Sequence, residues 1–256
     1  MRFASLGSGS EGNALVVEAC DGVSTTRVML DCGFSVREAE RRLARLALSA
    51  DSLDAIFVTH EHADHIGGAA ALARKYRIPI YTSWGTGQAS SLAPDLQVGW
   101  CRSEQPVVVG ALQALPYTVP HDAREPLQFV FSDGRNRLGV LTDAGSATPH
   151  LIDVLGGCSA LVLECNHDRE MLAGSKYPPS LKARIGGDYG HLANDSAANI
   201  LRSVERSRLK CIVAAHLSQQ NNSPMLARMA LAEAIDAAPD EILVATQEEG
   251  VGWQDA

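Results

Sequence analysis

A cluster of histidine and aspartate residues occupies positions 60 to 65, where the chain contains His60, His62, Asp64 and His65. Two imidazoles two positions apart on a strand-to-loop turn can converge on one metal ion. Asp64 and His65, one turn later, can face a second ion beside the first. A divalent cation also keeps neighbouring histidines neutral, whereas protonated imidazoles would repel one another. The spacing therefore predicts a binuclear metal site.

The elements that must position this cluster are short strands and amphipathic helices. Apolar runs of strand length, bounded by Gly, Pro or Asp, predict strands at 2–6, 14–18, 27–31, 54–59, 113–118, 127–132, 137–142, 160–164, 211–215 and 241–245. Helical spacing predicts helices over 36–48, 149–155, 195–206 and 224–237. This mixture indicates either two sheets covered by helices or one doubly wound sheet.

Length and composition are those of a globular protein, with 256 residues, 46% hydrophobic and 20% charged. No linker, low-complexity tract or short repeat divides the chain, so we expect a single domain spanning residues 1–256. A core of this size folds without a metal, so a metal site would serve chemistry. The net charge of −8 argues against a protein that coats nucleic acid through bulk electrostatics.

The cysteines and the absence of long apolar runs predict a cytoplasmic location. The six cysteines form no Cys-x-x-Cys pair and do not resemble a disulfide framework, so we expect reduced thiols. The first residues contain no apolar stretch of signal-peptide length, and no run approaches the 18 residues of a membrane span. We therefore expect no membrane partner.

The cluster and its two following glycines resemble the metallo-β-lactamase-fold hydrolases. That resemblance implies an α/β (α+β) protein with a four-layer αββα sandwich and two metals at one edge of the sheets. It also implies three further ligands: His121 completes the first metal's histidine trio, Asp143 bridges the metals, and His216 completes the second site. Secreted β-lactamases of the best-known type have a cysteine where this chain has Asp143, so drug hydrolysis is not expected.

Further segments resemble one branch of that superfamily, the WalJ/YycJ-like proteins, which are regarded as metal-dependent exonucleases acting on DNA. The resemblance covers most of the chain and rests on residues 6–13, 30–33, 164–168, 190–194 and 216–222. It implies 5′-to-3′ cleavage of duplex DNA. At Ala193 the chain departs from the branch, which commonly has serine there.

The same segments contain candidate catalytic and substrate-binding residues. His191 stands where phosphodiesterase members of the superfamily place a histidine that contacts phosphate or protonates the leaving oxygen, and Glu164 could orient it. His167 is an alternative to His191. The glycine-rich turn at 7–13 is expected to bring Asn13 towards the metal edge. Further candidate substrate contacts in the matching segments are Asn194 and Asn222.

Residues 175–184 form a basic segment in an otherwise acidic chain, with Lys176, Lys182 and Arg184. We expect a loop here, and its cations could contact nucleic-acid phosphates. The alternative is an ordinary solvated loop.

The leading hypothesis is a DNA exonuclease in which a hydroxide held between two metals attacks a phosphodiester, with Asp64 and Asp143 positioning that hydroxide. Zinc and manganese are the first candidates for the metals, and iron is possible because His and Asp sites accept all three. One alternative keeps the metals but hydrolyses a small thioester, lactone or cyclic phosphodiester. The other is a non-catalytic DNA-binding or regulatory protein. The sequence does not indicate an oligomeric state.

Overall fold

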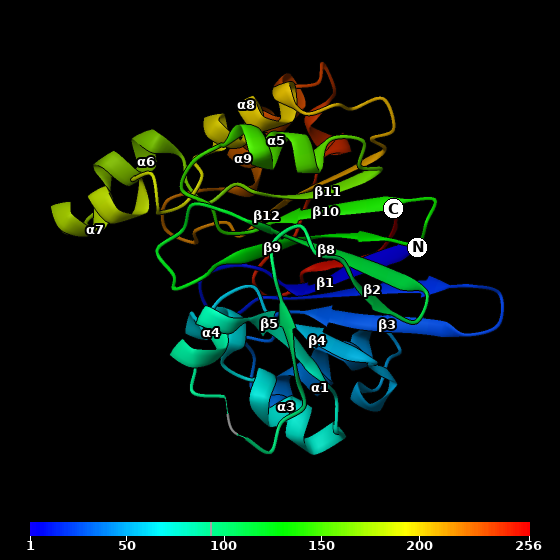
Figure 1. Ribbon diagram of the computed structural model, residues 1–256. Helices are drawn as coiled ribbons and strands as arrows, with labels where there is room; N and C mark the ends of the chain where they lie inside the picture. Colours follow the sequence, from blue (N-terminus) through cyan, green and yellow to red (C-terminus); the bar gives the residue numbers. More distant parts are fainter. Residues whose placement is uncertain (93) are drawn as a thin grey trace.

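Two mixed β-sheets lie face to face at the centre of the molecule (Figure 1). The structure is a computed structural model that describes residues 1–92 and 94–256. In spatial order the first sheet consists of β14 (Val251–Asp255), β1 (Arg2–Gly7), β2 (Ala14–Cys20), β3 (Thr25–Leu30), β4 (Ala55–Phe57), β5 (Ile80–Ser83) and β6 (Val98–Cys101). The second consists of β13 (Leu243–Val244), β12 (Cys211–Ala215), β11 (Ala160–Glu164), β10 (Arg137–Leu141), β9 (Leu127–Ser132), β8 (Leu112–Thr118) and β7 (Val107–Val109).

Both faces of the central strands are buried, which explains their nearly continuous apolar sequences. In β2, Leu15 and Val17 pack in the core between the sheets, whereas Ala14 and Val16 pack under the helices outside. This alternation follows from the period-two geometry of a strand. The inner core also contains Phe129 and the other aromatic side chains of β9.

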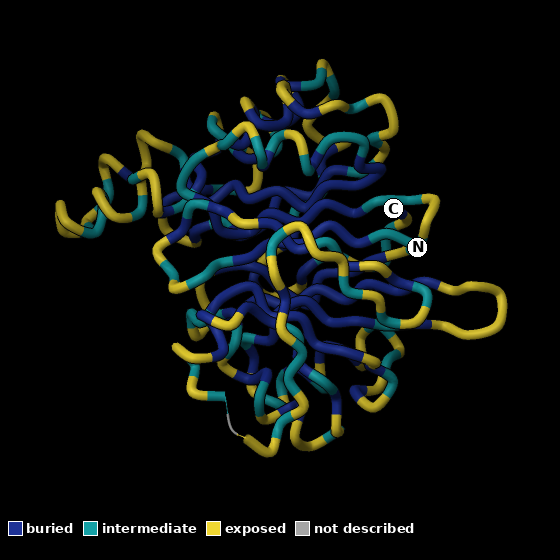
Figure 2. Tube along the Cα trace, in the orientation of Figure 1, coloured by how far each residue is buried: buried dark blue, intermediate teal, exposed yellow. Residues whose placement is uncertain are grey.

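Helices cover the outer faces of both sheets and complete four layers (Figure 1). The first sheet is covered by α1 (Val36–Arg45) and α3 (Ala69–Tyr76), and the second by α5 (Pro149–Leu155), α8 (Asn194–Ser203) and α9 (Pro224–Glu233). Burial is concentrated in the strands and the inner sides of these helices (Figure 2). The expected αββα sandwich is therefore confirmed. No described helix has both the length and the apolar run required to cross a bilayer.

Five of the described helices were not predicted: α2 (Ala63–Ile66), α3, α4 (Trp84–Ala89), α6 (Arg169–Gly174) and α7 (Pro179–Ile185). The expectation of a loop over 175–184 is wrong for its second half. Pro179 occupies the first turn of α7, where its missing N–H is not needed, and Leu181 and Ile185 lie one turn apart on one face. The pair α6 and α7 extends from the left side of the molecule (Figure 1).

Several predicted elements are shorter than expected, and each ends at an identifiable residue. The helix predicted over 36–48 ends at Arg45 because Ala47 adopts a left-handed conformation, with φ of 58°. The helix at 224–237 ends at Glu233, before Asp236 with φ of 55°. The strand predicted at 241–245 is reduced to β13 because Pro239–Glu241 forms a 3₁₀ turn.

The parallel strands of the two sheets end at the same edge of the sandwich. Strands β3, β4 and β5 run parallel in one sheet, and β10, β11 and β12 run parallel in the other. Side chains that follow the carboxyl ends of such strands meet at one edge, where α/β proteins commonly bind ligands. The residues predicted to bind metal follow the ends of β4, β8, β10 and β12.

Candidate metal centre

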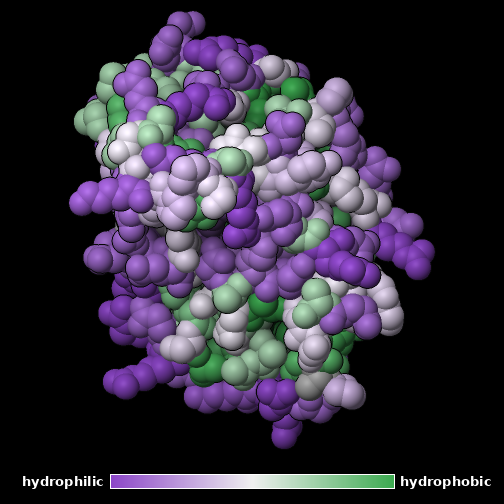
Figure 3. Space-filling view, turned by 90° about the vertical axis from the view of Figure 1, so that its left-hand side faces the viewer, coloured by the Kyte–Doolittle hydropathy of each residue, from purple (hydrophilic) through white to green (hydrophobic). Residues whose placement is uncertain are grey.

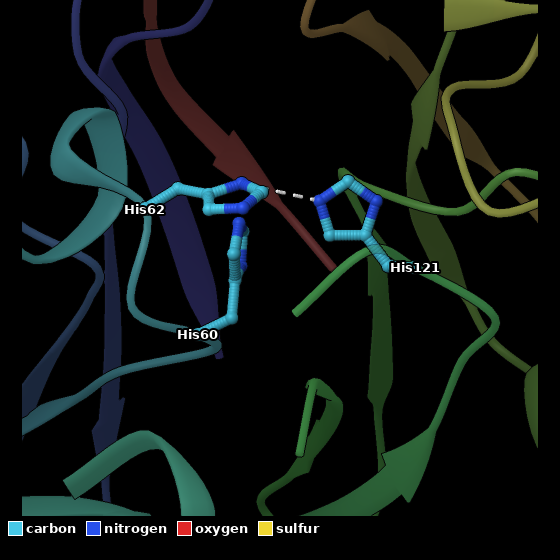
Figure 4. A group of neighbouring side chains, drawn as sticks. All are labelled: His60, His62 and His121. Carbon is cyan, nitrogen blue, oxygen red and sulfur yellow. Dashed lines mark hydrogen bonds between the residues drawn. The ribbon is translucent and has the colours of Figure 1, made fainter. Parts of the chain in front are cut away.

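Three histidines converge from the loops after β4 and β8. The Nδ1 atom of His62 lies 3.3 Å from Nε2 of His121, and the ring of His60 approaches the same point (Figure 4). One ring nitrogen from each of the three lies within 4.8 Å of the other two. Three imidazole nitrogens at such spacing can bind one zinc-like ion.

A second group of ligand atoms lies beside this trio. Atoms of Asp64, His65 and His216 lie within 4.8 Å of one another. Asp143 lies between the groups: its Oδ2 is 2.8 Å from Nε2 of His65, and its Oδ1 is 3.5 Å from Nδ1 of His216. Carboxylate and imidazole groups in this arrangement can hold a second divalent cation. The structure thus brings together all seven residues proposed as ligands.

Hydrogen bonds fix the orientation of three of the rings. Nδ1 of His65 lies 2.7 Å from the carboxylate of Asp31, and Nδ1 of His121 lies 3.0 Å from the carbonyl oxygen of Gly190. Carbonyl and carboxylate oxygens only accept, so both Nδ1 atoms carry a proton and both rings direct Nε2 towards the other ligand residues. Nδ1 of His60 similarly contacts the Thr59 hydroxyl at 2.9 Å.

The donor atoms fit a divalent cation. The Nε2 atoms of His60 and His216 and the Oδ2 atom of Asp143 are buried without a hydrogen-bond partner among the described residues. Such atoms are costly unless something else satisfies them, and a cation would satisfy all three. Burial alone would raise the pKa of Asp143, but the charges of His216 and His65 hold it well below its usual range. The carboxylate is therefore anionic at neutral pH, as a metal ligand must be.

His191 and Glu164 form a pair beside Asp143. Nδ1 of His191 lies 2.8 Å from Oε1 of Glu164 and 3.0 Å from Oδ1 of Asp143. Burial opposes protonation of His191, but its hydrogen bonds to the Asp143 and Glu164 carboxylates raise its pKa to about 10. The His191 side chain retains 24% exposure, whereas Glu164 is fully buried. His191 can therefore present a proton to a molecule in the pocket.

Backbone strain and close packing hold the ligand loops in place. Asp31 and His216 both adopt left-handed backbone conformations, with φ of 59° and 56°. Such conformations are uncommon outside glycine and concentrate at functional sites. Gly33 has no side chain because a Cβ there would overlap with the backbone carbonyl of Asp64. The turn after β3 thereby supports the helix that carries two ligands.

A pocket of about 330 Å³ opens over the second group of ligands. Arg184 of α7 forms part of the pocket wall, and the Nε atom of Arg184 donates to Oδ2 of Asp122 at 2.6 Å. The face of the molecule at this edge is largely hydrophilic across its middle (Figure 3). The pocket is lined by Ser10, His62, Ala63, Asp64, Asp122, Asp143, Leu181, Arg184, Ile185, Gly190, His191 and His216.

Four of the proposed substrate-binding residues lie inside the fold instead of in this pocket's lining. Asn13 is buried and donates to the carbonyl oxygens of Gly9 and Asp64. Asn194 and Asn222 are buried and hydrogen-bonded to each other at 2.9 Å. His167 is also buried, and burial lowers its pKa to about 4.

The two lysines of the basic segment are placed differently. Lys176 is exposed. Lys182, on α7, donates to the carbonyl oxygen of Ala173 at 2.6 Å. Of the three cations proposed for substrate binding, only Arg184 belongs to the pocket lining.

Several positioning residues carry no sequence pattern that would identify them. Asp31 accepts from the Thr59 backbone N–H at 2.8 Å and from its hydroxyl, so it links the loops after β3 and β4. Ser8 accepts from the His216 backbone N–H at 2.9 Å. Asn166 donates to the His216 carbonyl at 3.1 Å. The one available signal is an aspartate that directly follows a buried strand, as Asp31 does.

Comparisons with known proteins agree with this architecture. Residues 26–212 match the family model described as a beta-lactamase superfamily domain. The chain is 34% identical over 244 residues to the exodeoxyribonuclease YycJ of Bacillus anthracis, covering 92% of this chain and 89% of that protein. It is 32% identical over 238 residues to the exodeoxyribonuclease WalJ of Streptococcus pneumoniae, covering 90% of this chain and 86% of that protein.

Solved structures show the same fold at lower identity. The metallo-beta-lactamase fold protein YhfI from Bacillus subtilis superposes with a TM-score of 0.75 at 16% identity, covering 100% of this chain and 99% of that one. The short form of human tRNase Z gives a TM-score of 0.67 at 17% identity, with 100% and 99% covered. The chain therefore belongs to the beta-lactamase superfamily and, within it, to the metal-dependent hydrolases of the YycJ and WalJ branch.

Proposed function

We propose that this protein hydrolyses phosphodiester bonds of DNA as an exonuclease with two divalent metal ions. The observation that carries the proposal is the convergence of seven ligand residues at one edge of the sandwich, with His191 3.0 Å from the Asp143 carboxylate. The names of the YycJ and WalJ relatives support DNA as the substrate. The resemblance of this chain to the YycJ and WalJ branch also favours 5′-to-3′ cleavage of duplex DNA.

In this proposal each group of residues has a separate task. His60, His62 and His121 would hold one ion, and Asp64, His65 and His216 would hold the other, with Asp143 available to either. When bound, two such ions lower the pKa of a water molecule from about 15.7 towards 7 and offset charge on the phosphate.

Proton transfer to the leaving group falls to His191. Its exposure into the pocket lets it donate a proton to the departing sugar oxygen. Glu164 keeps His191 protonated and fixes its ring through the 2.8 Å contact at Nδ1, which leaves Nε2 free to donate.

Arg184 is proposed to bind a phosphate of the DNA. Its guanidinium lies at the pocket wall and is held by Asp122, and Lys182 stands two residues earlier on α7. Local cations of this kind allow an acidic protein to bind a polyanion, with affinity that falls as salt rises. The buried positions of Asn13, Asn194 and Asn222 favour a role in holding the loops.

The direct test is degradation of linear duplex DNA labelled at one 5′ end by the wild type and by Asp64→Ala, in manganese and in zinc. We expect metal-dependent release of label as mononucleotides by the wild type alone. Asp64→Ala removes a proposed ligand from the exposed side of the pocket. DNA that stays intact under all conditions, or equal degradation by both proteins at matched metal content, would contradict the proposal.

The six cysteines support a cytoplasmic location. All six carry free thiols, and four are buried: Cys32, Cys101, Cys158 and Cys165. Free thiols fit a reducing compartment.

A further inference from the structure

Two tryptophans form an exposed aromatic pair on α4 and β6. Trp84, in α4, is 57% exposed, and Trp100, in β6, is 44% exposed. Their ring centroids lie 4.7 Å apart at an interplanar angle of 67°. Gly87 makes this arrangement possible, since a Cβ at that position would overlap with the Trp100 ring. Large aromatic rings left open to water are candidates for contact with a ligand.

Hydrogen bonds connect this pair to the loops that carry the metal ligands. The Glu61 carboxylate, between His60 and His62, accepts from the backbone N–H of Arg124 at 2.7 Å and from the Thr86 hydroxyl at 3.4 Å. Through these bonds α4 is fixed against both the cluster at 60 to 65 and the loop that follows His121.

Glu125 provides a second connection. Its carboxylate accepts from the Gly85 backbone N–H at 2.6 Å, and its carbonyl oxygen accepts from the Ser83 hydroxyl at 2.7 Å. Trp84 lies between Ser83 and Gly85, so hydrogen bonds from Glu125 fix the backbone on both sides of it.

The surroundings of the pair favour a nucleotide. Arg124 packs beside Gly85, is exposed, and forms no side-chain hydrogen bond or ion pair with any residue that the structure describes. Two acids contact this segment: Glu61 accepts from the backbone N–H of Arg124, and Glu125 accepts from that of Gly85. In Figure 3 the hydrophobic side chains gather in the lower half of this face, on the side of α4. Aromatic rings with a free guanidinium suit a base and its phosphate.

We propose that Trp84 and Trp100 form a stacking site for an unpaired nucleobase of the strand whose phosphodiester lies at the metal centre, with Arg124 contacting its phosphate. This inference rests on the proposed nuclease function. Bases inside a duplex already stack on their neighbours, so an exposed protein ring takes a base from an unpaired strand or end. The site would hold nucleotides that have separated from the complementary strand, and it would favour substrates with single-stranded ends.

The first test measures binding through tryptophan fluorescence, in chelator so that no cleavage occurs. A thymidine oligonucleotide should quench the fluorescence, whereas an abasic oligonucleotide of equal length should not. Affinity for the thymidine strand, read from the anisotropy of a fluorescein label on that strand, should fall in the double variant Trp84→Ala, Trp100→Ala and stay at the wild-type value in Trp253→Phe, which changes the third tryptophan. Equal quenching by the abasic strand, or wild-type affinity in the double variant, would overturn the proposal.

The second test measures cleavage by the metal-loaded protein. Trp84→Ala or Trp100→Ala should raise KM for a single-stranded oligonucleotide about tenfold. Hydrolysis of bis(p-nitrophenyl) phosphate, which has no base, should be unchanged. An unchanged KM would overturn the proposal. A wild-type dimer that dissociates in Trp100→Ala would also overturn it, because the tryptophans would then form an interface between two copies of the chain. Loss of all wild-type cleavage would contradict the nuclease function, and the fluorescence test would still decide the stacking site.

Discussion

At the scale of single residues, the carboxylates of Asp143 and Glu164 together raise the pKa of His191. Replacing Glu164 with Gln keeps the shape but removes the carboxylate that stabilises the imidazolium at 2.8 Å. The pKa of His191 should therefore fall. Because His191 must be protonated to donate, the alkaline limb of the pH dependence of kcat should move to lower pH by about 1 to 2 units.

Two controls separate this effect from damage to the fold. Glu170→Gln changes an exposed glutamate on α6 and should leave the pH profile as in the wild type. His191→Gln should lower kcat about 100-fold or more and remove the alkaline limb. A Glu164→Gln profile that coincides with that of the wild type would show that Glu164 does not act through His191.

At the scale of elements, the fit between the turn after β3 and α2 places Asp64. Gly33→Ala introduces a Cβ that overlaps with the Asp64 carbonyl. We expect a loss of about 2 kcal/mol in the free energy of unfolding, because overpacking shifts the backbone. We also expect at least a tenfold loss of kcat through displacement of the ligand.

Gly174→Ala, at the end of α6, is the matched control because no atom lies within 4 Å of a Cβ there. Denaturant unfolding and steady-state cleavage should give wild-type values for it. If Gly33→Ala behaved like Gly174→Ala, the close packing of this turn would not determine the position of Asp64.

The elements also show how far sequence reasoning extends. Central strands such as β2 and β11 were predictable because burial on both faces leaves a continuous apolar run. The edge strand β6 was not, because it contains Gly99 and the exposed Trp100 and becomes a strand only by pairing with β5. The ligands at 60 to 65 were recognisable from their spacing, and His121, Asp143 and His216 through the family resemblance. Asp31 acts through a contact with His65 that only the fold creates.

At the scale of the whole molecule, three apolar cores hold the four layers together, so we expect the fold to form without the metals. A chelator should leave the far-ultraviolet circular dichroism unchanged. It should lower Tm by about 5–10 °C, because ligands that bind only the folded state stabilise it by mass action. His60→Ala should reduce this shift.

His150 offers a control outside the centre. It contacts only Glu104 among the described acidic groups, at 3.6 Å. His150→Ala should show the same chelator-induced fall in Tm as the wild type. Loss of secondary structure on chelation would instead mean that the metals are structural.

The central claim is that two metal ions act together in one centre. The most direct measurement is the rate of DNA cleavage by metal-free protein as manganese is added in known molar equivalents, with bound metal determined in the same samples. The account predicts no cleavage without metal and a rate that stops rising at about two bound equivalents. Cleavage by the metal-free protein, or a rate that stops rising at one bound equivalent, would contradict it.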